Sequence, residues 1–261
     1  MMATSLLAWP GAIAIGLSLG LLGSGGSIIT VPVLVYLLGQ DEKIARAGSL
    51  FVVGTIALAG SLQYVRVGLV DWRNVFVFGV PGMMGTYLGA LIAAFVPGIM
   101  QLAFFSLVML LASYMMLRPV KLTNEVHAPR ETWKIAADGL VVGVITGLVG
   151  VGGGFLIVPA LVLLGGLPIH TAVATSLVII ALKSYSGFYK YLDVLDTQNL
   201  ELDWPTLMLV TALGIAGSFG GAKIAKRLPQ EKLKKGFGLF LIVMGVYILA
   251  RSLPQVMKLV S

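Results

Sequence analysis

The chain contains no cysteine and little charge: Asp, Glu, Lys and Arg make up 11% of its 261 residues, against roughly a quarter in soluble domains. The missing cysteine excludes disulfides, thiolate metal sites and cysteine catalysis. The low charge is combined with 58% hydrophobic residues and a mean hydropathy of +0.98. This composition excludes an ordinary soluble domain and predicts an integral membrane protein.

Histidine and polar stretches are also scarce. The two histidines, His127 and His170, fall in predicted loops and form no recognisable metal-binding pattern. The longest hydrophilic segment, 118–134, is too short for a soluble domain. We therefore expect neither a metal nor a cofactor. The net charge is +7, and the basic residues cluster at the edges of apolar blocks. Cytoplasmic loops and anionic lipid headgroups favour such a distribution, so we expect the partner to be the lipid bilayer and not nucleic acid.

The sequence does contain a copy of itself. Residues 16–39 return at 143–166, shifted by 127 positions, with half of the 24 positions identical. The match includes Pro32 with Pro159 and, after a five-residue insertion, Asp71-Trp72 with Asp203-Trp204. We predict a membrane repeat at 1–117, a cytoplasmic connector at 118–134 and a second membrane repeat at 135–261. Paired repeats with interrupted apolar segments are typical of secondary transporters. The first apolar block belongs to the repeat and lacks a charged leader, so we expect it to be mature structure and not a cleaved signal.

Eight apolar blocks follow one another, and the loop charges distinguish two ways of threading them through a membrane. If every block crosses once, the Lys and Arg residues outside Lys183 divide nine against eight. If the longer first and fifth blocks, 6–38 and 135–164, break at their glycines and return, the division is twelve against five. The positive-inside rule prefers the second arrangement. We therefore predict an all-α polytopic protein with two inverted repeats, each a broken, re-entrant helix hairpin plus three transmembrane helices, and with both termini outside.

The two breaks are glycine clusters within apolar runs. Their residues are Gly23, Ser24, Gly25, Gly26 and Ser27 in the first, and Gly150, Gly152, Gly153 and Gly154 in the second. Broken backbone at membrane depth must face protein or a water-filled cavity. The amides of the following half-helix, at its positive dipole end, would then face an anion. The alternative is close helix packing, which we prefer for the sparser pairs Gly16/Gly20, Gly143/Gly147, Gly85/Gly89 and Gly217/Gly221.

Four further side chains are candidates for the same site. Lys183 lies within an apolar block, where a lysine normally faces a cavity or partner and would favour an anion; snorkelling to the membrane edge is the alternative. Ser49, Thr175 and Ser176 lie in the second crossing of each repeat and could donate to an oxyanion. Hydrogen bonding to their own helix carbonyls is at least as good an explanation. Arg46 and Asp138 lie near block ends, and we expect both at the membrane interface.

The motif G-x-x-x-G-x-x-G-x-G-G-[SG]-x-x-x-x-P-x-L occurs twice, each time followed by a T-S-L or G-S-L helix. In this it resembles the TauE/SafE sulfite exporter family of membrane proteins over nearly the whole chain. The resemblance implies transport of sulfite, sulfoacetate or a related organosulfonate, often outward and driven by an ion gradient. Ser27 replaces Gly154, and Gly48 replaces Thr175, in the first repeat, so the resemblance does not imply equal substrate contacts from both halves.

We accordingly expect a multi-pass transporter of the bacterial inner membrane that binds a small anion and works by alternating access. An anion channel or an uptake permease is an alternative, and a homodimer is left open. A membrane-embedded enzyme is less favoured, because the sequence offers no intramembrane Asp pair or Ser/His arrangement.

Overall fold

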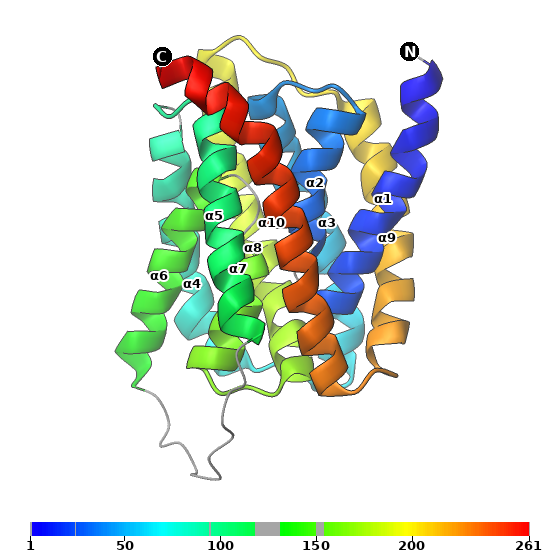
Figure 1. Cartoon of the computed structure of the whole chain (residues 1–261). Coiled ribbons are helices and arrows are strands. Elements are labelled where there is room, and N and C mark those ends of the chain that lie inside the picture. Colours follow the sequence, from blue (N-terminus) through cyan, green and yellow to red (C-terminus); the bar gives the residue numbers. More distant parts are fainter. Residues whose placement is uncertain (1, 24, 94, 118–130, 150–153, 261) are drawn as a thin grey trace.

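The structure, a computed structural model, describes residues 2–23, 25–93, 95–117, 131–149 and 154–260, and within these ranges it contains helices and no strand (Figure 1). The first half forms α1 (Met2–Leu22), α2 (Gly25–Pro32), the π-helix η1 (Val33–Leu37), α3 (Glu42–Arg66), α4 (Trp72–Ala93) and α5 (Gly98–Leu117). The second half repeats the order as α6 (Thr132–Val149), α7 (Gly154–Pro159), η2 (Ala160–Leu164), α8 (Ile169–Thr197), α9 (Trp204–Ala225) and α10 (Gln230–Val260). The all-α class is thereby confirmed.

Five described helices are long and apolar enough to cross a membrane, namely α3, α4, α6, α8 and α9. Shorter apolar helical stretches are Trp9–Leu22, Gly98–Tyr114 and Gly238–Pro254. Large apolar side chains cover the outside of the bundle; Met84 is 63% exposed and Leu111 is 60% exposed. An outer surface of this kind suits hydrocarbon and not water. The protein is a multi-pass membrane protein.

The first long apolar block breaks and doubles back, as the glycines predict. α1 ends at Leu22, α2 begins at Gly25, and the two helices pack against each other. A Cβ added to Gly26 would lie 2.6 Å from the Leu19 Cβ, and one added to Gly11 would lie 3.1 Å from Val33. Successive residues of α2 and η1 thus meet successively earlier residues of α1, which defines an antiparallel hairpin. In the fifth block α6 ends at Val149 and the contacting helix α7 begins at Gly154, while 150–153 lie outside the described residues.

Each half-helix passes into a π-helical segment directly after its proline. Pro32 ends α2 and Pro159 ends α7. Proline has no N–H to donate and its ring clashes with the carbonyl four residues back, and the wider π turn that follows suits such a position. The Leu38 N–H donates to the Val33 carbonyl at 3.1 Å, and the Gly165 N–H to the Ala160 carbonyl at 3.0 Å. The sequence indicated an interruption near the prolines but not this form of it.

Corresponding helices of the two halves run antiparallel where they meet. Between α3 and α8, a Cβ on Gly54 would lie 3.0 Å from Ser184, whereas one on Gly60 would lie 4.0 Å from Leu177. Later residues of α3 therefore meet earlier residues of α8. Helices α5 and α10 behave alike, because the positions around 110 and 117 contact Gly245 and Gly238 respectively. The start of α1 and the end of α10 lie at the same end of the molecule, the upper one in Figure 1.

Glycines bring two further helix pairs into backbone contact. Gly16 and Gly20 of α1 lie against the α9 carbonyls of Gly214 and Ser218. In the matching pair, Gly143 and Gly147 of α6 lie against the α4 carbonyls of Gly82 and Thr86. A side chain at any of these glycines would collide with backbone. The packing interpretation of the sparser glycine pairs is confirmed. The four most extensive helix contacts, α4 with α6, α1 with α9, α5 with α10 and α3 with α8, all join one half to the other.

The duplicated Asp-Trp pair begins a helix in each half. The Asp203 carboxylate accepts a hydrogen bond from the Thr206 N–H at 3.3 Å at the start of α9. At the start of α4, the Asp71 carboxylate accepts from the Asn74 N–H at 3.1 Å. Such N-caps satisfy backbone donors that the first helical turn leaves free.

Candidate substrate site

The first glycine break rests directly on a helix of the other half. Gly23 has a φ of +71°, a left-handed conformation that favours glycine. The Ser176 hydroxyl on α8 contacts the Gly23 carbonyl oxygen at 3.1 Å and its own helix at the Val173 carbonyl at 2.8 Å. A Cβ on Gly23 would lie 2.8 Å from Val173 and 2.9 Å from Ser176. The break thus needs glycine for both conformation and space, and Ser176 combines local bonding with contact to the break.

The two half-helices that follow the breaks come together. Gly25 begins α2, Gly154 begins α7, and α2 and α7 are in contact. Gly26 packs on α1, and Ser27 lies in the first turn of α2. Ser24, Gly150, Gly152 and Gly153, which the sequence also predicts for the site, lie outside the described residues. The described part therefore brings two short half-helices, one from each half, into contact, and α7 also contacts α8.

Thr175 has a structural partner far away in the sequence. Its hydroxyl oxygen accepts a hydrogen bond of 2.9 Å from the Asp71 N–H, which ties α8 to the turn before α4. The equivalent residue in the first half is Gly48, where a Cβ would lie 2.7 Å from Leu207 Cδ2. Packing against Leu207 thus explains the glycine. Ser49, the equivalent of Ser176, is fully buried on α3.

Lys183 lies within α8 and is enclosed by protein. Its side chain is fully buried, and its Nζ has no hydrogen-bond partner among the described residues. It lies over Phe78 of α4, 5.9 Å from the ring centroid. A Cβ on Gly82 would lie 3.0 Å from Lys183 Cδ, so this glycine provides room for the lysine stem. A side chain enclosed in this way is not snorkelling to the membrane edge.

Lys183 does not touch Gly23. It follows Ser176 by seven residues on α8, which places it about 10 Å further along the helix. The equivalent position in the first half is Ile56, whose side chain packs on Gly214 as Lys183 packs on Gly82. The two contacts are therefore equivalent, but only the one at Lys183 contains a charge.

Arg46 was expected at the membrane interface; it lies in the first turns of α3, and the structure adds that protein covers it. Its side chain is fully buried. One terminal nitrogen, Nη2, donates to the Gly98 carbonyl at 2.6 Å and lies 3.5 Å from Glu42. A charge in the first turns of a helix usually reaches water, but here the start of α5 covers the Arg46 guanidinium. Gly98 makes this burial possible, because it has no side chain to obstruct the guanidinium.

The described residues contain no group of three or more His, Asp or Glu that could hold a metal ion. What they do provide near the first break is hydroxyls and helix starts, with the Lys183 ammonium further along α8; Arg46 lies elsewhere, against the start of α5. An uncompensated cation in a low-dielectric interior is costly unless a partner is present. The arrangement is chemically suited to binding a small anion.

Comparison with known proteins also indicates a membrane transporter. Residues 8–248 match the family described as sulfite exporter TauE/SafE. A probable membrane transporter protein of Xylella fastidiosa (strain 9a5c) is 33% identical over 91% of this chain and 92% of its own. The probable membrane transporter protein YunE of Bacillus subtilis (strain 168) is 28% identical over 86% and 90%. A further one from Methanocaldococcus jannaschii is 25% identical over 94% and 96%. No solved structure matches the chain.

Proposed function

The chain belongs to the sulfite exporter TauE/SafE family, and from that premise we propose that it is a secondary transporter of small sulfur-containing anions such as sulfite, sulfoacetate or a related organosulfonate. The observation that carries the proposal is the meeting of α2 and α7 beside α8, with Ser176 on the first break. Half-helix starts at membrane depth are a recurrent way of holding an anionic group in transporters. Export across a bacterial plasma membrane is the direction we propose.

In this proposal the substrate lies between the half-helix starts, in contact with their backbone amides. The site is formed by the cluster residues Gly23 to Ser27, by Ser49 and Ser176, and by Gly150, Gly152, Gly153 and Gly154, while Thr175 holds α8 in place. Lys183 supplies a counter-charge deeper in the bundle. Its Nζ has no partner among the residues that the structure describes, which supports this role, because a buried ammonium gains most from a mobile anion when no carboxylate competes for it.

We also propose that the two halves are inverted relative to each other and that transport proceeds by alternating access. Support comes from the antiparallel contacts of α3 with α8 and α5 with α10, and from the charges. The end of the molecule that holds Arg66, Lys134 and Lys226 is the more basic one. The positive-inside rule places that end in the cytoplasm.

The test of function is flux into proteoliposomes with a panel of sulfur oxyanions and an imposed ion gradient. A carrier gives saturable, gradient-dependent flux of at least one member of the panel. Flux that rises linearly with concentration would indicate a channel instead. No flux of any sulfur oxyanion by protein of native thermal stability would contradict the substrate class.

The topology has an independent test, because the chain is free of cysteine and single cysteines can be labelled without background. A cysteine replacing Asp196 should react with an impermeant reagent from outside the cell. One replacing Lys235 should react only after permeabilisation. Labelling of both from the same side would refute the inverted arrangement.

A further inference from the structure

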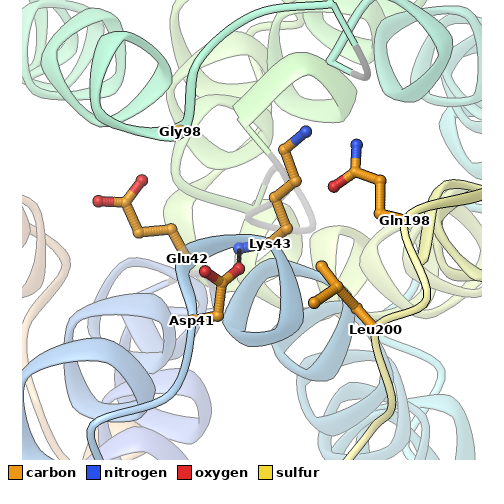
Figure 2. A pocket seen from close by; sticks show the side chains of 6 residues that line it. All are labelled: Asp41, Glu42, Lys43, Gly98, Gln198 and Leu200. Carbon is orange, nitrogen blue, oxygen red and sulfur yellow. Dashed lines mark hydrogen bonds between the residues drawn. The ribbon is translucent and has the colours of Figure 1, made fainter.

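A surface cleft of about 350 Å³ lies where α3 and α5 begin and α8 ends. Its lining is Asp41, Glu42, Lys43, Gly98, Gln198 and Leu200. Figure 2 shows the Glu42 and Lys43 side chains extending from the start of α3, with Gln198 and Leu200 along the opposite rim. The proposed topology places this cleft on the external face, away from the glycine breaks.

Arg46 lies beneath this cleft, against two of its lining residues. A Cβ on Gly98 would be 2.9 Å from Arg46 Nη2 and 3.0 Å from Nη1. The guanidinium therefore does not line the cleft but lies directly behind Gly98 and Glu42, which do. Arg46 is fully buried, yet its Nε and Nη1 have no hydrogen-bond partner in the part of the chain that the structure describes. Buried polar groups are nearly always bonded, and each exception needs an explanation. A missing anionic ligand is one.

The acidic residues of the cleft do not satisfy Arg46. The Asp41 carboxylate accepts from the Lys43 N–H at 2.8 Å as the N-cap of α3 and is engaged there. Glu42 approaches Arg46 Nη2 at 3.5 Å, a long contact, and 31% of its side chain is exposed. Lys43 forms no ion pair with any other described residue. Glu42 is therefore a partly exposed counter-ion held to Arg46 by one long contact.

We propose that this cleft is an anion-binding subsite, in which the Arg46 guanidinium takes a small oxyanion in exchange for the Glu42 carboxylate. Guanidinium groups bind planar and tetrahedral oxyanions through several charge-assisted hydrogen bonds. The Lys43 ammonium adds a second positive charge above. Since the bound anion would be the one carried, the subsite rests on the proposed function and deepens it, as a loading or release position at the external end of the path.

The mechanism predicts opposite effects for two neighbouring side chains. Glu42→Gln removes the competing carboxylate and should tighten anion binding about fivefold or more, whereas Arg46→Gln should weaken it about tenfold or more. Arg46→Lys keeps the charge but loses the planar donor array and should fall between wild type and Arg46→Gln.

Anion binding in the cleft can be measured with a probe on its rim. We would replace Leu200, an apolar residue of the rim, by cysteine, attach an environment-sensitive fluorophore to the full-length purified protein, and titrate with sulfite and, as a stable analogue, sulfate. The matched control is Asp193→Asn. Asp193 pairs with Lys190 at 2.7 Å on α8 and lies toward the same end of the molecule, so its loss changes net charge equally without affecting Arg46. The control should shift the midpoint by less than twofold.

The expected result is a saturable signal that Glu42→Gln shifts to lower concentration and the control does not. No anion-dependent signal, or equal midpoints for wild type and Glu42→Gln, would overturn the subsite. If Arg46→Gln does not fold, Glu42→Gln decides the matter, since misfolding cannot tighten binding. Transport in liposomes without a cleft signal overturns the subsite alone. A cleft signal without transport of any sulfur oxyanion overturns the proposed function alone.

Discussion

The two halves of the chain share a backbone but not its polar chemistry. Each has a long helix followed by a short half-helix in contact with it, a proline followed by a π-helical segment, and an Asp at the start of its fourth helix. At equivalent positions, however, the first half has Ile56 where the second has Lys183, and Arg46 where the second has Val173. Each buried cation thus belongs to one half only.

The difference shows which features the architecture requires in duplicate and which the ligand requires once. Glycines at backbone contacts recur because both helix pairs need the same close approach. Charges need not recur, because one anion bound between the halves can be neutralised from either side. A sequence position whose twin is apolar is therefore the better candidate for substrate chemistry. The predictions below test the shared features first and the unequal ones afterwards.

The largest effect is expected at the first break. Gly23→Ala combines a strained positive φ with a collision against Val173 and Ser176, and transport should fall more than about tenfold. The control is Gly39→Ala, which has a φ of +66° but open space around it. Strain alone should cost about 1–2 kcal/mol there and leave transport largely intact. Equal losses of flux in the two variants would show that conformation, and not contact with α8, makes Gly23 necessary.

The packing glycines should respond equally in the two halves. Gly20→Ala and Gly147→Ala each drive a Cβ into a carbonyl of the partner helix, at Ser218 and Thr86 respectively. Backbone cannot give way as a side chain does, so each should cost about 3 kcal/mol or more in the free energy of unfolding. Gly220→Ala, which faces open space, should be neutral or stabilising by up to about 1 kcal/mol. Denaturant titration in mixed micelles gives all three values, and a marked difference between the first two would break the equivalence of the halves.

The cation pocket should respond unequally. Lys183→Met should weaken sulfite affinity about tenfold, and by more for the dianion than for hydrogensulfite, because the lost interaction is Coulombic. Ile56→Met, at the equivalent position, should leave affinity unchanged. The measurement is the apparent KM for sulfite across the pH range in which the monoanion becomes the dianion. An identical pH profile in Lys183→Met and wild type would remove Lys183 from the path of the anion.

The smallest effect is expected where α8 meets the turn before α4. Thr175→Val removes the acceptor of the Asp71 N–H and should cost about 1 kcal/mol in the free energy of unfolding while transport persists. Gly48→Ala presses only on the flexible end of Leu207 and should cost a similar amount or less. Loss of transport by Thr175→Val at unchanged stability would place its hydroxyl on the substrate and not on the backbone.

Much of this architecture could be read from the sequence, because its signals are local or repeated. The helical class follows from long apolar blocks, the breaks from dense glycines, and the close helix pairs from glycines four residues apart. The exact partners could not be read in this way. Thr175 bonds a residue 104 positions away, and Arg46 is buried only because α5 covers it. Such contacts depend on which helices become neighbours, and a single sequence does not encode that in any short pattern.

The interleaving of the halves has a mechanical consequence. Where α1 meets α9 and α4 meets α6, glycines place backbone on backbone, so each pair should move as one rigid body. Each such body takes one helix from each half, and the sequence repeats therefore cannot rock against each other as units. Shear is left to the seams where side chains meet, such as the one where Thr55 of α3 and Tyr185 of α8 share a hydrogen bond of 2.9 Å. The units that we expect to move therefore each combine helices from both halves, and their boundaries differ from those of the two sequence repeats.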